Sequence, residues 1–167
     1  MNNLHLPTLF HVFLEDFKNE SPATKKVVLA IPETISDYRP DEKAKTAIDL
    51  AWHILYSDIW FLKGIAALEF DKNFEERPAH VATGAALMAW YEAQVAEHLP
   101  KVKAMSEEQY ATPVDFYGMF NFPAVFYLQF MINHHIHHRG QLSTYLRPMG
   151  GKCPSIYGGS ADEPMGA

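Results

Sequence analysis

Four long segments of this chain place apolar residues three and four positions apart, which is the spacing of one face of an α-helix. In the first segment, Phe10, Phe13 and Phe17 fall on one such line. We expect the four helices to cover about residues 8–31, 46–68, 83–99 and 122–147. No other segment has a convincing strand pattern. The sequence therefore predicts an all-α protein built as a four-helix bundle.

Capping residues define where these helices begin. Thr8 and Asn121 are suitable N-cap residues for the first and last helices. Thr46 and Asp49 form a predicted capping box, in which the carboxylate of Asp49 reaches back to the backbone N–H of Thr46. These signals predict that the second helix starts sharply after Thr46.

Prolines and long connections determine how the helices follow one another. Pro22 is expected to kink or split the first helix, and Pro100 to end the third. Neighbouring helices are expected to be antiparallel. The connections 32–46 and 99–121 are long enough to carry crossovers, so the order of the helices in space stays open.

Length, charge and cysteine content narrow the class of protein. The chain has 167 residues, which predicts one domain over 1–167 with a core that needs no disulfide. A formal charge of −6 argues against non-specific nucleic-acid binding. Cys153 is the single cysteine, no apolar run approaches the roughly 20 residues of a membrane span, and the N-terminus lacks a signal-peptide pattern. We expect a cytoplasmic protein that binds neither nucleic acid nor membranes.

Histidines are concentrated in the last helix. Four of the nine lie within 134–138. His134 and His138 are four positions apart, so their side chains lie on one helix face. Met131 and Leu142 belong to the same largely apolar line, which indicates that the pair points inward. Two imidazoles at this spacing can bind one metal ion together.

The pair alone does not establish a metal site, because a histidine on an apolar helix face is more often a core residue with one hydrogen bond. A third imidazole would complete a common ligand set that leaves one coordination position open. His53, in the middle of the second helix, is the candidate. The histidines for which we expect solvated or capping roles near helix ends are His5, His11, His80 and His98.

Several motifs resemble the DinB-like (DinB/YfiT) family, whose members are regarded as metal-dependent. The resemblance extends over nearly the whole chain, and its most specific part is the HHRGQ segment together with an upstream histidine. The residues that carry it are 24–26, 31–33, 50–54, 60–65, 134–141 and 146–158.

The resemblance implies a bundle with a triad of histidine ligands, carried over to His53, His134 and His138. His137 matches another family histidine but lies off the shared face, which leaves it a supporting or structural residue. The family implies a divalent ion, with zinc or nickel favoured, and a homodimer. Its members include thiol-dependent S-transferases and proteins described as hydrolases, acting on small molecules. The implied function is therefore S-transfer or hydrolysis with a low-molecular-weight thiol or water, with a non-catalytic metal-binding stress-response protein as the alternative.

Residues beside the triad have two interpretations each. Arg139 either contacts an anionic or thiolate substrate or pairs with an acid such as Asp58, and pairing is favoured. Gln141 either orients a ligand imidazole or only packs. Gly140 is expected to permit close helix packing. No glutamate adjoins the ligands as in HExxH enzymes, and metal affinity is expected to fall below about pH 6.5, where free imidazole takes up a proton.

Overall fold

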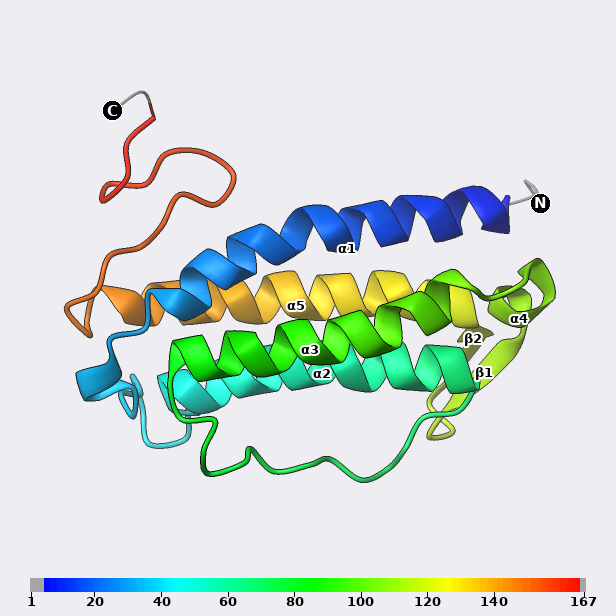
Figure 1. The fold of residues 1–167 in the computed structure, drawn as a ribbon, viewed down its shortest axis with the longest axis horizontal. Helices are drawn as coiled ribbons and strands as arrows, with labels where there is room; N and C mark the ends of the chain where they lie inside the picture. Colours follow the sequence, from blue (N-terminus) through cyan, green and yellow to red (C-terminus); the bar gives the residue numbers. More distant parts are fainter. Residues whose placement is uncertain (1–4, 166–167) are drawn as a thin grey trace.

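Four long helices lie side by side in the computed structural model, which describes residues 5–165 (Figure 1). They are α1 (Leu6–Leu29), α2 (Ala47–Ala67), α3 (Gly84–Lys103) and α5 (Ala124–Leu146). The short elements are η1 (Glu33–Ile35), α4 (Glu107–Ala111), β1 (Pro113–Phe116) and β2 (Phe120–Pro123). The predicted all-α bundle is confirmed, with one small hairpin added at an end.

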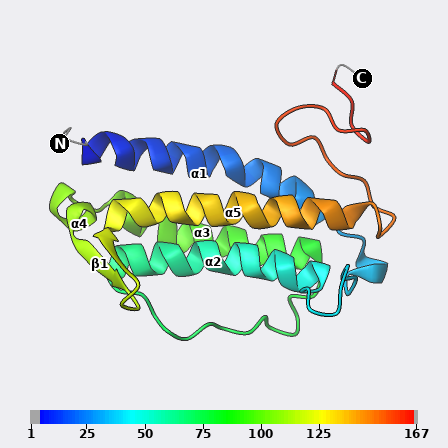
Figure 2. The ribbon, with the colours of Figure 1, turned by 180° about the vertical axis from the view of Figure 1, so that it is seen from behind.

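The connection between α2 and α3 carries the crossover. Residues 68–83 run back along the length of the bundle, so that α2 and α3 point in the same direction (Figures 1 and 2). The expectation of antiparallel neighbours was therefore wrong for α2 and α3, and the crossover lies in 68–83 rather than in either of the connections 32–46 and 99–121 that could have carried it. α2 ends where Leu68 adopts a left-handed conformation, with φ of 58°, which turns the chain out of the helix.

Side chains of α2 hold this crossover segment in place. Its anchors, in chain order, are the bonds from Trp60 Nε1 to the Asp71 carbonyl (3.0 Å), from the Glu75 N–H to the Tyr56 hydroxyl (2.9 Å) and from Arg77 to Asp49 (3.0 Å). Successive anchor residues of the segment bond to residues that come progressively earlier in α2. The segment therefore lies along the helix, and its polar backbone finds partners there.

The helix boundaries differ from the expected ones for local reasons. α1 begins at Leu6 rather than after Thr8, and it continues through Pro22 because the following turn buries Val27 completely. α3 likewise continues through Pro100 to Lys103. Each proline removes one helix hydrogen bond, and the packing of the adjoining turns outweighs that loss.

The start of α2 follows the predicted cap with one change. The Thr46 hydroxyl accepts the Asp49 N–H at 3.2 Å, as an N-cap should. The Asp49 carboxylate, however, accepts the Thr46 hydroxyl at 2.6 Å rather than the backbone N–H, and it also pairs with Arg77. The predicted N-cap at Thr46 is thus confirmed. The predicted bond from the Thr46 backbone N–H to the Asp49 carboxylate is wrong.

The hairpin before α5 was not expected from the sequence. β1 and β2 pair antiparallel, with Val114 opposite Phe122. Tyr117 and Gly118 both have positive φ in the connecting turn, where the Asp115 carboxylate accepts the Gly118 N–H at 3.1 Å. Because residues 120–123 are paired as a strand, α5 begins at Ala124 and not after Asn121.

α2 is the central helix, covered by α3 and α5 and by the crossover segment. Its buried residues include Ile54, Leu55 and Ile59, each fully enclosed. None of the helices within residues 5–165 is both long and apolar enough to cross a membrane. The contact between α2 and α5 positions the candidate site.

Candidate metal centre

Three imidazole nitrogens converge between α2 and α5. His53 Nε2 lies 3.1 Å from His134 Nε2 and 3.3 Å from His138 Nε2. His134 and His138 are one turn apart on α5, and His53 faces them from the middle of α2. The structure therefore brings together all three histidines of the expected triad, in a cluster that can hold a metal ion.

The spacing of these nitrogens fits a ligand set better than a hydrogen-bonded set. At a metal–nitrogen distance of about 2.0–2.1 Å with tetrahedral angles, ligand nitrogens lie about 3.3 Å apart. A hydrogen bond between two imidazoles uses one proton and joins only one pair of nitrogens. Without a metal ion, the lone pairs of a neutral triad would therefore face one another at close range. The donor set, three imidazoles and no thiolate, suits a divalent ion of borderline softness.

Gln141 orients one of the three rings. His138 Nδ1 donates to Gln141 Oε1 at 2.7 Å, so its Nε2 is free of a proton and carries its lone pair toward the other imidazoles. The Gln141 amide in turn donates to His137 Nε2 at 3.1 Å. This hydrogen bond agrees with the orienting role expected of Gln141. The exposed His137 ring also lies edge-on against the His138 ring, with their centroids 4.8 Å apart.

Burial keeps the three imidazoles neutral. Desolvation, reinforced by the neighbouring His138, lowers the pKa of His53 to about 4. Desolvation and the adjoining histidines lower the pKa of His134 to about 3. Desolvation also lowers the pKa of His138, opposed by its hydrogen bond to Gln141. All three rings therefore have free lone pairs for a cation at neutral pH.

No acidic side chain joins this cluster. Within residues 5–165, the only group of three or more histidine, cysteine or acidic residues close enough to share an ion is the triad itself. Cys153, half-buried in the segment after α5, is not part of it. The expected absence of an HExxH-type base agrees with this geometry.

His135 belongs to a separate, fully buried network. Its Nδ1 donates to Asp58 Oδ2 at 2.6 Å, and the Tyr91 hydroxyl donates to the same oxygen at 2.7 Å. The Thr24 hydroxyl hydrogen-bonds His135 Nε2, and Arg139 reaches Thr24 at 3.4 Å. The five side chains come from all four long helices, so one polar network joins the whole bundle.

Arg139 makes an interhelical ion pair, as the favoured interpretation held, but with a different acid. Its guanidinium lies 2.7 Å from Glu20 Oε2 of α1, and it is 1% exposed. It also donates to the Tyr157 hydroxyl, which ties the C-terminal segment to α1. Asp58 is instead the partner of His135. Buried Arg139 is therefore a structural residue rather than a substrate contact.

Gly140 does not serve the close packing expected of it. A Cβ added there would meet no atom within 4 Å, and the residue is exposed. Gly84, in contrast, packs tightly, because a Cβ at that position would lie 2.4 Å from the Val28 carbonyl oxygen. The reason for a glycine at position 140 must lie outside helix packing.

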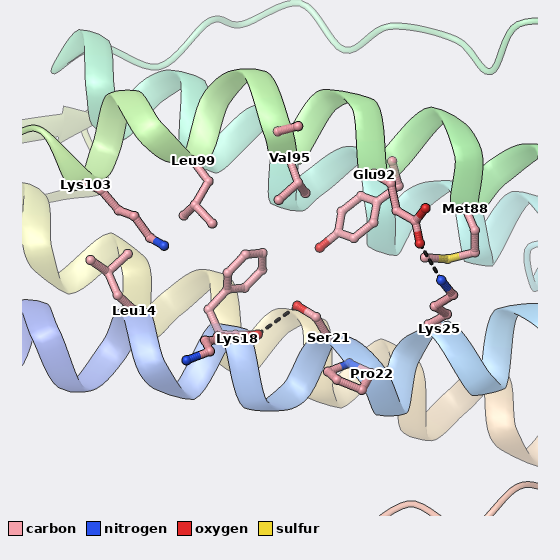
Figure 3. Close-up of a pocket in the computed structure, with 13 residues that line it drawn as sticks. Leu14, Lys18, Ser21, Pro22, Lys25, Met88, Glu92, Val95, Leu99 and Lys103 are labelled. Carbon is pink, nitrogen blue, oxygen red and sulfur yellow. Dashed lines mark hydrogen bonds and ion pairs between the residues drawn. The ribbon is translucent and has the colours of Figure 1, made fainter.

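An apolar groove also lies between α1 and α3, with a volume of about 440 Å³ (Figure 3). Leu14, Val95 and Leu99 line it, and the Lys25–Glu92 ion pair, at 2.5 Å, closes one side. None of the three clustered histidines reaches this groove. It is thus distinct from the candidate centre.

Comparison with known proteins agrees with the fold. The sequence model of the DinB family matches residues 1–165. The chain belongs to the DinB family. The uncharacterized DinB relative YrdA of Bacillus subtilis is 25% identical over 156 residues, which are 93% of this chain and 92% of YrdA.

Solved structures of DinB-like proteins have the same bundle. The DinB-like protein YjoA of Bacillus subtilis superposes with a TM-score of 0.69 at 25% identity, covering 86% of this chain and 96% of YjoA. A DinB-like protein of Bacillus cereus superposes with a TM-score of 0.73 at 23% identity, covering 87% of this chain and 95% of its own. The DinB bundle is therefore the frame that brings α2 and α5 together.

Proposed function

We propose that this DinB protein is a divalent-metal-dependent enzyme whose ion is held by His53, His134 and His138. The observation that carries the proposal is the convergence of three imidazoles, with Nε2 of His53 lying 3.1 Å from Nε2 of His134 and 3.3 Å from Nε2 of His138. Three histidines form the ligand set of known catalytic zinc sites, where one coordination position stays open for water or substrate. Zinc or nickel is the ion we favour.

The proposed reaction is thiol S-transfer to a small molecule, or hydrolysis of one. A divalent ion held by neutral ligands keeps its full charge and lowers the pKa of a bound thiol or water. The protein holds the three rings neutral by burial and fixes the His138 ring through Gln141. Since no carboxylate joins the triad among residues 5–165, the site offers no evident base to deprotonate water, which favours a low-molecular-weight thiol.

The experiment pairs two neighbouring histidines of α5. His138→Ala should abolish binding of zinc and nickel. His137→Ala removes an exposed ring that contacts Gln141 and the edge of the His138 ring but does not belong to the cluster of three histidines, and it should still bind metal. Metal content is measured after loading and gel filtration, and the circular dichroism spectrum confirms that both variants are folded. Full metal binding by His138→Ala would refute the ligand assignment.

Turnover is tested separately from metal binding. The metal-loaded wild type and both variants are assayed with several low-molecular-weight thiols and a small electrophile, following thiol loss. We expect activity in the wild type and His137→Ala only. Metal binding without activity toward any thiol or hydrolysable ester would leave the alternative, a metal-binding protein without turnover.

A further inference from the structure

A second cavity, of about 570 Å³, opens directly beside the triad. Its walls come from the segment that precedes α2, from the first turn of α2 and from the last two turns of α5. The residues that line it are Ala44, Lys45, Leu50, His138, Gly140, Gln141, Thr144 and Tyr145. Its volume lies within the range of small-molecule sites. It also contains both the ligand His138 and the residue that orients it.

Lys45 is the only Lys, Arg, Asp or Glu residue of that lining. It is exposed and takes part in none of the ion pairs formed within the described part of the chain. The nearby acid, Asp49, is already paired with Arg77 and bonded to Thr46. The ammonium of Lys45 is close enough to the triad to lower the pKa of both His53 and His138. The lining of the groove thus contains one positive charge and no negative charge.

Gly140 keeps the same groove open. A glycine inside a helix costs up to about fivefold in the folding equilibrium relative to alanine, and no packing contact explains it here. Gly140 is one of the residues that line the groove, together with His138 and Gln141. A larger side chain at this position would project into the space beside the ligand. The absence of a side chain at position 140 therefore matters for the shape of the groove and not for the packing of the helices.

We infer that this groove is the substrate-binding site and that it takes a small monocarboxylate with an apolar body, whose carboxylate pairs with Lys45 while Gly140 leaves room for the body. The inference rests on the proposed function and names its substrate class. A single ammonium matches a single negative charge, whereas the groove has no arginine fork to match a phosphate. Leu50 and the Tyr145 ring supply the apolar wall.

The role of the positive charge of Lys45 is tested with carboxylic acids and their matched neutral amides. Benzoate and 3-phenylpropionate, with their neutral amides, are titrated calorimetrically into metal-free and cobalt(II)-loaded protein. Lys45→Ala should weaken carboxylate binding roughly threefold at low salt and leave amide binding unchanged. Lys43→Ala, which removes an exposed lysine two positions away that does not line the groove, should bind the carboxylates like the wild type.

The room that Gly140 leaves in the groove is tested by placing a large side chain at this position. Gly140→Leu should retain cobalt(II), since the three histidines are untouched, and should lose binding of acids and amides alike. Asn133→Leu, an exposed substitution on the same helix two turns away, is the control and should bind the probes normally. Melting temperatures of both variants establish that they fold.

The results separate this inference from the proposed function. Cobalt(II) binding without any carboxylate binding, or with binding that Lys45→Ala and Gly140→Leu leave unchanged, would overturn the inference and leave the metal site standing. Failure to bind cobalt(II) would refute the proposed function, and the titrations of metal-free protein would still decide whether the groove takes carboxylates. Equal affinity for acids and amides would also overturn the assignment of a carboxylate to Lys45.

Discussion

Asp58 and His135 form a hydrogen-bonded pair in the centre of the bundle, with Oδ2 and Nδ1 separated by 2.6 Å. Neither side chain is more than 1% exposed. Asp58 comes from α2 and His135 from α5, the two helices that also carry the triad. His135 directly follows the ligand His134 in the chain. The pair therefore fixes the same helix contact on which the metal centre depends.

Removal of this pair should cost much of the stability. Asp58→Ala leaves the Nδ1–H of His135 and the hydroxyl of Tyr91 without their acceptor in a dry interior. We expect the free energy of unfolding to fall by about 3 kcal/mol, measured by urea denaturation. Glu15→Ala, which removes the exposed partner of Lys18, should change it by less than about 1 kcal/mol. Equal effects of the two substitutions would contradict the central role of the buried pair.

The bond between Gln141 and His138 should affect metal affinity more than stability. Gln141→Ala frees the His138 ring to rotate and to change tautomer, and we expect metal affinity to fall at least about tenfold. Competition with a chromophoric chelator measures the change. Gln141→Glu keeps an acceptor oxygen for Nδ1 and should retain most of the affinity. A Gln141→Ala protein with wild-type affinity would mean that the triad is fixed by packing alone.

The pH dependence of metal binding should be shifted toward acid. Free imidazoles would lose affinity below about pH 6.5, which is the expectation from sequence alone. Burial lowers the pKa of His53 to about 4 and of His134 to about 3, so protons compete with the metal only at lower pH. We expect near-constant affinity from pH 8 to about pH 5 and a loss toward pH 4. A decline that begins at pH 6.5 would show that the rings are solvated.

The same lowered pKa values predict that the metal-free protein becomes less stable in acid. Between about pH 6.5 and pH 4 the unfolded chain takes up protons on His53 and His134 that the folded protein does not. Unfolding is therefore favoured as pH falls through this window, and the stability present above pH 6.5 is lost. Urea denaturation of metal-free protein at pH 7.5 and 5 measures it. His134→Gln should reduce the difference, because glutamine does not titrate.

Two glycines in helices should respond oppositely to alanine. Gly140→Ala adds a methyl group to open space and should raise the free energy of unfolding by about 0.5–1 kcal/mol. Gly84→Ala would place a Cβ against the Val28 carbonyl of α1, and we expect a loss of about 1–3 kcal/mol. Thermal unfolding of both variants compares them directly. A stabilising Gly84→Ala would mean that α1 and α3 can separate without cost.

Sequence patterns predicted what depends on residues close together in the chain. The four helices, the N-cap at Thr46 and the shared face of His134 and His138 all follow from local spacing. His53 was a candidate because it lies in the middle of the second helix, and the family resemblance assigned it to the triad. No local pattern shows that α2 contacts α5. That contact depends on the crossover of 68–83, whose anchors on α2 are single side-chain bonds without a sequence signature.

The other differences have physical causes of the same kind. The hairpin strands have only four residues each, which is too short for a clear alternating pattern, although Tyr117-Gly118 between aromatic residues was a usable turn signal. The acid that pairs with Arg139 is on α1, more than a hundred positions away. Since several acids could serve equally well in the sequence, only the packed bundle selects Glu20.

The route of the chain between the two halves of the triad has a mechanical consequence. His53 and His134 are separated by 81 positions, and the intervening chain includes the crossover, α3, α4 and the hairpin. An ion shared by these histidines would close a loop of about half the protein and restrict the unfolded chain accordingly. A protease cut within 68–83 would then leave two fragments held together by the packing of the bundle and, in addition, by the ion. Nicked protein should therefore separate into its fragments at a lower urea concentration after chelation than with the ion bound.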